Sequence, residues 1–286
     1  MYKRQAFGPT TTSTAQLTIT PTTDFDGTVT SVSVKAITAA SSPVVSFTSS
    51  DGTTNKLEFR ASSASSTNTA VGNGALQWNI TGGVNNSAFG HAALQLNTTG
   101  SNNSAFGYLA LSSNTTSGAN SAFGYTALLN STGGSNSAFG YASMQKNTTG
   151  TANSAFGTNA LFSNTTGNSN SAFGYYALNF NTTGNNNSAF GINALLNNTT
   201  SSGNSAFGYN ALSSSTTSSG NSAFGYTALS NSTGGSNSAF GYSALSSNTT
   251  GSSNSAFGYG ALANNTTGTT KYRLWAERAS RKYNRQ

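Results

Sequence analysis

The sequence predicts an all-β protein: a parallel β-solenoid of about twelve 17-residue coils, preceded by a few antiparallel strands. A unit of the form N-S-A-F-G-Y-x-A-L-x-x-N-T-T-G recurs from Asn68 onward. Only 6% of the residues are charged, against about 25% in ordinary globular proteins. No position in the unit shows the 3.6-residue apolar period of a helix. Together these observations favour a repeat architecture built from short strands and turns.

The repeat has a nearly constant length. Successive units start 16 to 18 residues apart, mostly 17, and the two 16-residue steps shorten the N-T-T turn at 130–133 and 231–234. Length changes are therefore expected in a loop, while N-S-A-F-G keeps its register. The first Asn of each unit is Asn68, Asn86, Asn103, Asn120, Asn136, Asn153, Asn170, Asn187, Asn204, Asn221, Asn237 and Asn254.

Two apolar ladders are expected to fill the interior, because each turn of a solenoid lies about 4.8 Å above the last and identical positions stack. The first ladder follows Val71 of the first coil and consists of Phe89, Phe106, Phe123, Phe139, Phe156, Phe173, Phe190, Phe207, Phe224, Phe240 and Phe257. The second consists of Leu76, Leu94, Leu111, Leu128, Met144, Leu161, Leu178, Leu195, Leu212, Leu229, Leu245 and Leu262. Strand alternation then puts Ala and Gly of A-F-G on the opposite face, where a neighbouring chain would pack closely.

The polar positions of the unit have structural interpretations. Gly after Phe permits a corner or a close backbone approach, and stacked Asn side chains can bond along the axis. One coil buries only a Phe, a Leu and two Ala, which is little against about 1–2 kcal/mol of backbone entropy per ordered residue. We therefore expect further burial through self-association.

The repeat resembles known surface repeats. N-S-A-F-G-Y-x-A-L is similar to the N-S-V-A-I-G-x-x-A-x-A coils of trimeric autotransporter adhesin heads, which are left-handed parallel β-rolls in a trimer. The fuller pattern with N-T-T-G resembles repeats of phage tail-fibre and bacterial surface proteins. The resemblance covers about 200 residues and implies a homotrimer.

The segment before the repeats differs in composition. Residues 15–20 and 28–35 alternate apolar and polar residues, which is typical of half-buried strands. The stretch 17–35 resembles closing strands of carbohydrate-binding-module-like jelly rolls, so residues 6–43 are interpreted as the remnant of a β-sandwich module. A second hairpin, with strands at 44–47 and 56–60, is expected within a connecting segment at 44–66, before a solenoid at 67–270.

The sequence offers no catalytic, cofactor or metal site, and we expect a protein that is not an enzyme. The repeats contain no Asp or Glu for acid–base chemistry, and the chain has no Cys and one His, His91. The stretch 24–27, D-F-D-G, resembles part of a calcium loop but lacks its third acid and its Glu, so we interpret it as a turn. His91 falls where most coils have Tyr and is interpreted as a surface or corner aromatic.

A row of Tyr residues could either pack between coils or stack against sugars. The candidate glycan contacts are Tyr108, Tyr125, Tyr141 and Tyr209. The repeated Thr pairs suggest an ice-binding solenoid as an alternative. Those pairs fall in the turn where the length of the repeat changes. A flat ice-binding face should not tolerate such length changes.

The two ends account for the whole net charge of +7. Residues 271–286 carry +5 and begin where a thirteenth unit is due. Reading the tail one base later yields N-T-A-F-G-[Q/L]-N-A-L-x-x-N-T-T-G, so it is interpreted as a frameshifted coil, unstructured or poorly packed. The alternative is a basic tail that binds nucleic acid or a membrane. Residues 1–5 carry +2 and resemble a sequencing-library scar.

The sequence therefore favours a fragment of a fibrous protein on a virion tail fibre or a cell surface. It would act as a homotrimeric shaft that spaces and presents receptor-binding parts and contacts a host-surface glycan or protein, without nucleic acid and without inserting into a membrane. A bacterial trimeric adhesin head, an ice-binding β-solenoid and a disordered linker are the alternatives.

Overall fold

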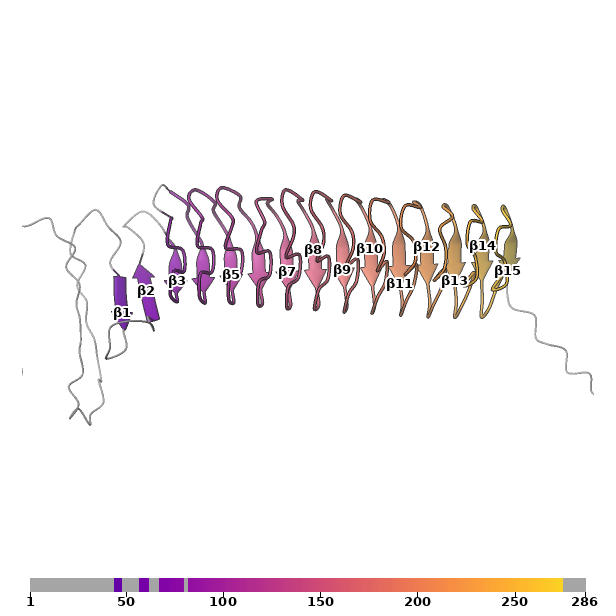
Figure 1. Ribbon diagram of the computed structural model, residues 1–286, viewed down its shortest axis with the longest axis horizontal. Coiled ribbons are helices and arrows are strands. Elements are labelled where there is room, and N and C mark those ends of the chain that lie inside the picture. The colour runs from indigo at the N-terminus through magenta and orange to yellow at the C-terminus, as the bar shows by residue number, and fades with distance from the viewer. Residues whose placement is uncertain (1–43, 48–56, 62–66, 80–81, 275–286) are drawn as a thin grey trace, which may run out of the picture.

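A computed structural model describes residues 44–47, 57–61, 67–79 and 82–274. These residues form an all-β rod without helices, in which coil after coil stacks along one axis (Figure 1). Fifteen strands form one sheet in sequence order, and the thirteen from β3 onward are parallel. The predicted parallel β-solenoid of about twelve 17-residue coils is confirmed.

Each coil contributes one three-residue strand. The strands are β3 (Thr69–Val71), β4 (Ser87–Phe89), β5 (Ser104–Phe106), β6 (Ser121–Phe123), β7 (Ser137–Phe139), β8 (Ser154–Phe156), β9 (Ser171–Phe173), β10 (Ser188–Phe190), β11 (Ser205–Phe207), β12 (Ser222–Phe224), β13 (Ser238–Phe240), β14 (Ser255–Phe257) and β15 (Tyr272–Leu274).

An antiparallel hairpin lies at the N-terminal end of the sheet. Strand β1 (Val44–Phe47) pairs with β2 (Leu57–Ala61), and β2 pairs antiparallel with β3. These strands agree with the expected hairpin at 44–47 and 56–60. Its turn, the expected strands at 15–20 and 28–35, the turn at 24–27 and the suspected scar at 1–5 lie outside the described residues.

The parallel strands pair in register, so every position stacks on its own counterpart. Ser154 lies beside Ser171, and Phe156 beside Phe173. The same register is kept across a 16-residue coil, where Ser121 pairs with Ser137. The length change is therefore absorbed in the turn, as the sequence predicted.

The interior of each coil is filled by small and medium side chains. In one coil Ala105, Ala110, Leu111, Asn103 and Asn114 are all fully buried. The strand Ala, the turn Ala and the Leu or Met recur as one continuous apolar core from Ala70 to Ala261. The expected Leu ladder thus lies inside the rod.

The Phe ladder lies outside, which corrects the expectation that it fills the interior. Within each Ser-Ala-Phe strand from β4 to β13 only the Ala is buried, while the Ser and the Phe are partly exposed. The Phe rings stack on one another along the surface at centroid distances of 4.6–4.9 Å. Since Ala and Leu occupy the narrow interior, the face that carries the strand Ala is the core of the coil and is not available to a neighbouring chain.

The Leu ladder adopts a left-handed backbone. Leu161 has φ 52°, and the other residues of the ladder from Leu76 to Leu262 lie between 50° and 52°. This conformation costs about 1–2 kcal/mol for an L-residue. Complete burial of a Leu side chain contributes about 1.5–3 kcal/mol, which offsets the strain. The left-handed residues turn the chain sharply enough to direct each Leu into the core.

Glycine after Phe is required by a close approach between coils. Gly107 has φ 140°, and a Cβ added there would lie 2.3 Å from the carbonyl oxygen of Gly124. The same contact recurs from coil to coil along the Gly column. The expected corner and close approach are therefore both confirmed.

Two columns of buried Asn stabilise the turns. In the first, the backbone N–H of Asn103 donates to Oδ1 of Asn86 at 3.0 Å. In the second, Nδ2 of Asn164 donates to Oδ1 of Asn147 at 2.7 Å and to the carbonyl of Gly167 at 3.0 Å. Because each amide bonds both along the axis and across its own turn, the buried polar groups are largely satisfied.

The first short coil leaves two of these amides incompletely bonded. Ser131 takes the Asn position there, and its hydroxyl donates to Gly133 within the shortened turn. Oδ1 of Asn114 and Nδ2 of Asn120, both buried, then have no partner among the described residues. Such unsatisfied groups typically cost about 1–3 kcal/mol each.

Substituting one residue on each side of a strand tests which side faces the core. Ala155→Leu is expected to destabilise the protein by about 1–3 kcal/mol or more, because it overfills a packed interior. Phe156→Leu is expected to cost less, because the ring lies at the surface. Urea unfolding followed by far-UV circular dichroism measures both, and a larger loss for Phe156→Leu would contradict the assignment.

The orphaned Asn114 oxygen predicts a stabilising substitution. Ser131→Asn supplies an Nδ2 donor for that oxygen and should raise the free energy of unfolding by about 1 kcal/mol relative to Ser232→Asn. Ser232 occupies an identical short turn, but the residue at its position in the preceding coil is Ser215 instead of Asn. The hydroxyl of Ser215 bonds within its own turn, to the hydroxyl of Ser218. Equal effects of the two substitutions in thermal or urea unfolding would refute this account.

Candidate functional site

The Tyr row forms the most exposed aromatic feature of the coils. Eight Tyr side chains occupy the position two residues after Phe and are 41–69% exposed: Tyr108, Tyr125, Tyr141, Tyr175, Tyr209, Tyr226, Tyr242 and Tyr259. His91 occupies the first rung and stacks on Tyr108 at 5.1 Å. The interpretation of His91 as a surface aromatic agrees with this position.

The row is divided into two stacks of four rings. The first runs from His91 to Tyr141 and the second from Tyr209 to Tyr259, with centroid distances of 5.0–5.2 Å. Thr158 and Ile192 interrupt it. Because neighbouring rings cover one another's faces, the inner rings present mainly their edges and hydroxyl groups to solvent.

The stacking changes which of the candidate glycan contacts can offer a ring face. Tyr108 and Tyr125 have a stacked ring on both sides, whereas Tyr141 and Tyr209 end their stacks and each have a stacked ring on one side only. Tyr141 is 55% exposed and Tyr209 41% exposed. Of the four candidate contacts, Tyr141 is therefore the most exposed and also ends a stack.

Tyr175 lies between the two stacks and has a different environment. Its ring meets Tyr176 edge to face at 4.3 Å. A side-chain hydrogen bond with Tyr176 raises the pKa of Tyr175, and desolvation adds to the effect. Tyr175 therefore stays protonated at higher pH than a free phenol.

The first Thr of the turn pairs uses its hydroxyl group within the rod, whereas the second, such as Thr149, is exposed. Oγ1 of Thr148 donates to the carbonyl of Thr165 at 2.9 Å, and Oγ1 of Thr182 donates to Thr199 at 3.0 Å. The same bond recurs in other coils. These donors are thus engaged in holding coils together rather than presented as an array to water.

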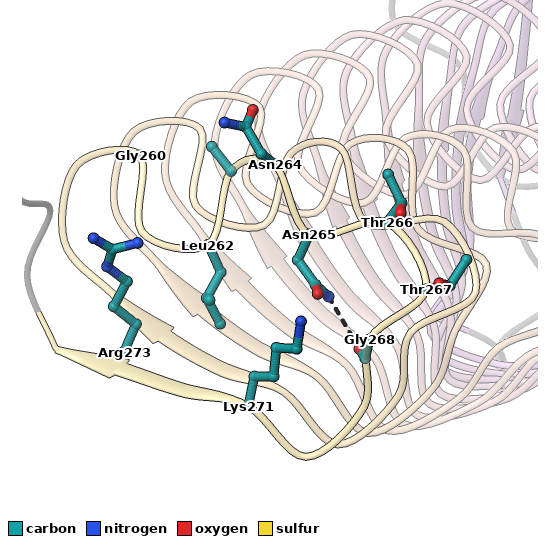
Figure 2. A pocket seen from close by; sticks show the side chains of 10 residues that line it. Gly260, Leu262, Asn264, Asn265, Thr266, Thr267, Gly268, Lys271 and Arg273 are labelled. Carbon is teal, nitrogen blue, oxygen red and sulfur yellow. Dashed lines mark hydrogen bonds between the residues drawn. The ribbon is translucent and has the colours of Figure 1, made fainter.

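A hollow of about 400 Å³ lies at the C-terminal mouth of the solenoid (Figure 2). Leu262, Asn265 and Gly268 of the last full coil line it together with Lys271 and Arg273. Nδ2 of Asn265 donates to the carbonyl of Gly268 at 3.0 Å across this mouth. Among the described residues, the hollow lies at the last coil of the stack.

The first residues of the basic tail follow the path of the repeat. Strand β15 pairs in register with β14, which puts Arg273 opposite Ala256 and Leu274 opposite Phe257. The N–H of Lys271 donates to Oδ1 of Asn254 at 3.0 Å, as the Asn of a repeat would. A cation thus occupies the position of a buried Ala, and residues 275–286 lie outside the described part.

The coils between residues 82 and 270 are almost uncharged. Lys146 is the single Asp, Glu, Lys or Arg between residues 82 and 270, and its Nζ lies 4.9 Å from the centre of the Phe162 ring. In the described ranges there is no group of three or more His, Cys, Asp or Glu side chains that could hold a metal. The same residues include no helix of the length and hydropathy that spanning a membrane requires.

Sequence reasoning missed the outward Ser ladder and the buried Ala ladder of the strands. The Ala of N-S-A-F-G occurs without exception in all twelve units, whereas the Phe position accepts Val71 in the first. That invariance within the repeat was the signal that the strand Ala is buried at a position where a larger side chain would not fit. Searches of family models, curated proteins and solved structures gave no significant match to this chain.

The lack of carboxylates in the coils predicts stability that hardly depends on pH. The thermal midpoint of the solenoid should change by less than about 2 °C between about pH 4 and pH 9, because residues 82–270 contain no Asp or Glu whose ionisation could be coupled to folding. Circular dichroism at several pH values tests this. A steep loss of stability on acidification would contradict this prediction.

Proposed function

We propose that this chain forms the shaft of a fibrous protein on a phage tail fibre or a cell surface, where it spaces and presents receptor-binding parts. The observation that carries the proposal is the rod itself: twelve coils in constant register, stacked along one axis (Figure 1). At about 4.8 Å per coil the rod extends about 55–60 Å. A repeating element of this kind sets the distance between the parts attached to its two ends.

The proposed role is mechanical rather than catalytic. The side chains that recur in every coil are used in stacking, core packing and axial hydrogen bonds, as the Asn and Phe columns illustrate. The proposal includes self-association, expected as a homotrimer, and an extracellular or virion location. It involves neither nucleic acid nor insertion into a membrane.

Weak contact with a host-surface glycan is the second part of the proposal. The exposure of Tyr141, 55% at the end of its stack, supports it, since aromatic side chains offer flat apolar surfaces beside a polar hydroxyl. We assign it a secondary role, because the inner rings of both stacks bury their faces against one another.

Immunogold electron microscopy of the cells or virions that carry this protein tests the proposed location. Antibodies raised against the purified chain are expected to label tail fibres or the outer cell surface, and absorption of the serum with the protein should abolish the labelling. Labelling confined to the cell interior would overturn the proposal.

A further inference from the structure

The outer face of the sheet carries two parallel ladders of different size. Each strand from β4 to β14 directs its Ser and its Phe outward and its Ala inward. The Ser ladder and the Phe ladder therefore run side by side, separated by the buried Ala column. No residue of β3 to β14 is charged, and continuous apolar stripes of more than a few hundred Å² mark interaction sites on soluble proteins.

A second copy of this chain is the partner that fits the repeat distance of this face. The Phe rings recur every 4.6–4.9 Å over eleven rungs. A partner of another shape would match one or two rungs, whereas a second copy matches all of them. The two short coils also fall at the same height in a copy that lies level and parallel.

The order of Ser and Phe across the strand distinguishes parallel from antiparallel association. When two such sheets face each other about an axis parallel to the rods, the strand directions oppose. The Phe of one copy then lies over the Ser of the next. When the rods are antiparallel, Phe meets Phe and Ser meets Ser. Bulky side chains against small ones interdigitate best, as in dry sheet-to-sheet interfaces.

The available area is sufficient for a stable contact. Strands about 10 Å wide over a rod of about 55 Å outline roughly 550 Å² per copy. Two copies thus bury about 1,100 Å² in total, even without the additional surface of the protruding side chains. This area exceeds the approximate 1,000 Å² of specific interfaces. The exposed Tyr row next to the Gly corner can extend this area.

From these observations we propose that copies of this chain associate side by side, with parallel axes and level coils, the Phe ladder of each copy packed on the Ser ladder of the next. The inference rests on the proposed function, in which several copies form one shaft, and it specifies the contact surface. Two copies make this contact face to face, whereas three copies around a common axis would pair the same Phe and Ser ladders edge to edge, each copy meeting two neighbours. It replaces the small-residue face that strand alternation suggested, because that face is the interior of the coil.

Molar mass in solution tests the contact surface. The full chain at micromolar concentration is expected to give a multiple of the monomer mass by light scattering. Phe156→Lys with Phe190→Lys, and separately Ser154→Lys with Ser188→Lys, should each reduce it to the monomer mass, because the charges would be buried. The Ser pair leaves the Phe stack intact, so far-UV circular dichroism should remain unchanged for that variant.

A matched control carries the same charges on another face. Thr149 and Thr183 are exposed on the turns, and Thr149→Lys with Thr183→Lys should leave the mass of the assembly unaltered. A monomeric wild-type chain, or an undiminished mass for the Ser-pair variant, overturns the proposal. Either result would leave the surface location seen by immunogold labelling unaffected.

Single cysteines test the parallel arrangement, because the chain has no Cys of its own. After the variants are mixed and refolded together, a short bis-maleimide should join Ser104→Cys of one copy to Phe106→Cys of another. Preferential joining of Ser104→Cys to Ser222→Cys would indicate antiparallel rods and refute the proposed packing. Thr166→Cys, on an exposed turn, should give no cross-linked product.

Discussion

Axial hydrogen bonding between successive coils is the interaction on which the structure depends. The N–H of Ser154 donates to Asn170 of the following coil at 2.8 Å, and the N–H of Gly157 donates to Phe139 of the preceding coil at 2.8 Å. Because these bonds require neighbouring coils to follow the same path, each residue meets its own counterpart above and below. Stacked rings, amide columns and the glycine close approach are all consequences of that requirement.

The same requirement explains why strained and narrow elements persist. A left-handed Leu161 is costly alone, but its N–H bonds to Ala177 of the next coil at 3.0 Å and its side chain is fully buried. The strain recurs at the corresponding position of other coils, and so does the burial that offsets it. Gly107 likewise has no alternative, since any larger residue would meet the backbone of the next coil.

The period of the sequence was enough to predict the number of coils, the strand positions and the location of the length changes. It could not decide which side of the strand faces inward, because alternation defines two faces without ranking them. The usual preference for large apolar residues inside favoured Phe156, whereas the space left by Leu161 and its neighbours admits only Ala155. The breaks of the Tyr row at Thr158 and Ile192 were visible in the sequence. The stacking of neighbouring Tyr rings was not, because it depends on the rotamers that these side chains adopt.

The two ends of the rod differ, and this gives it a direction of unravelling. In a stack of nearest-neighbour contacts, loss of structure starts at the ends and proceeds coil by coil. At one end β3 is paired with a hairpin strand; at the other, Arg273 stands where every preceding coil has Ala. The free energy of local opening should therefore be lowest at the C-terminal coil and rise toward the middle. Amide hydrogen exchange should accordingly be fastest in the C-terminal coil and slower in each coil before it.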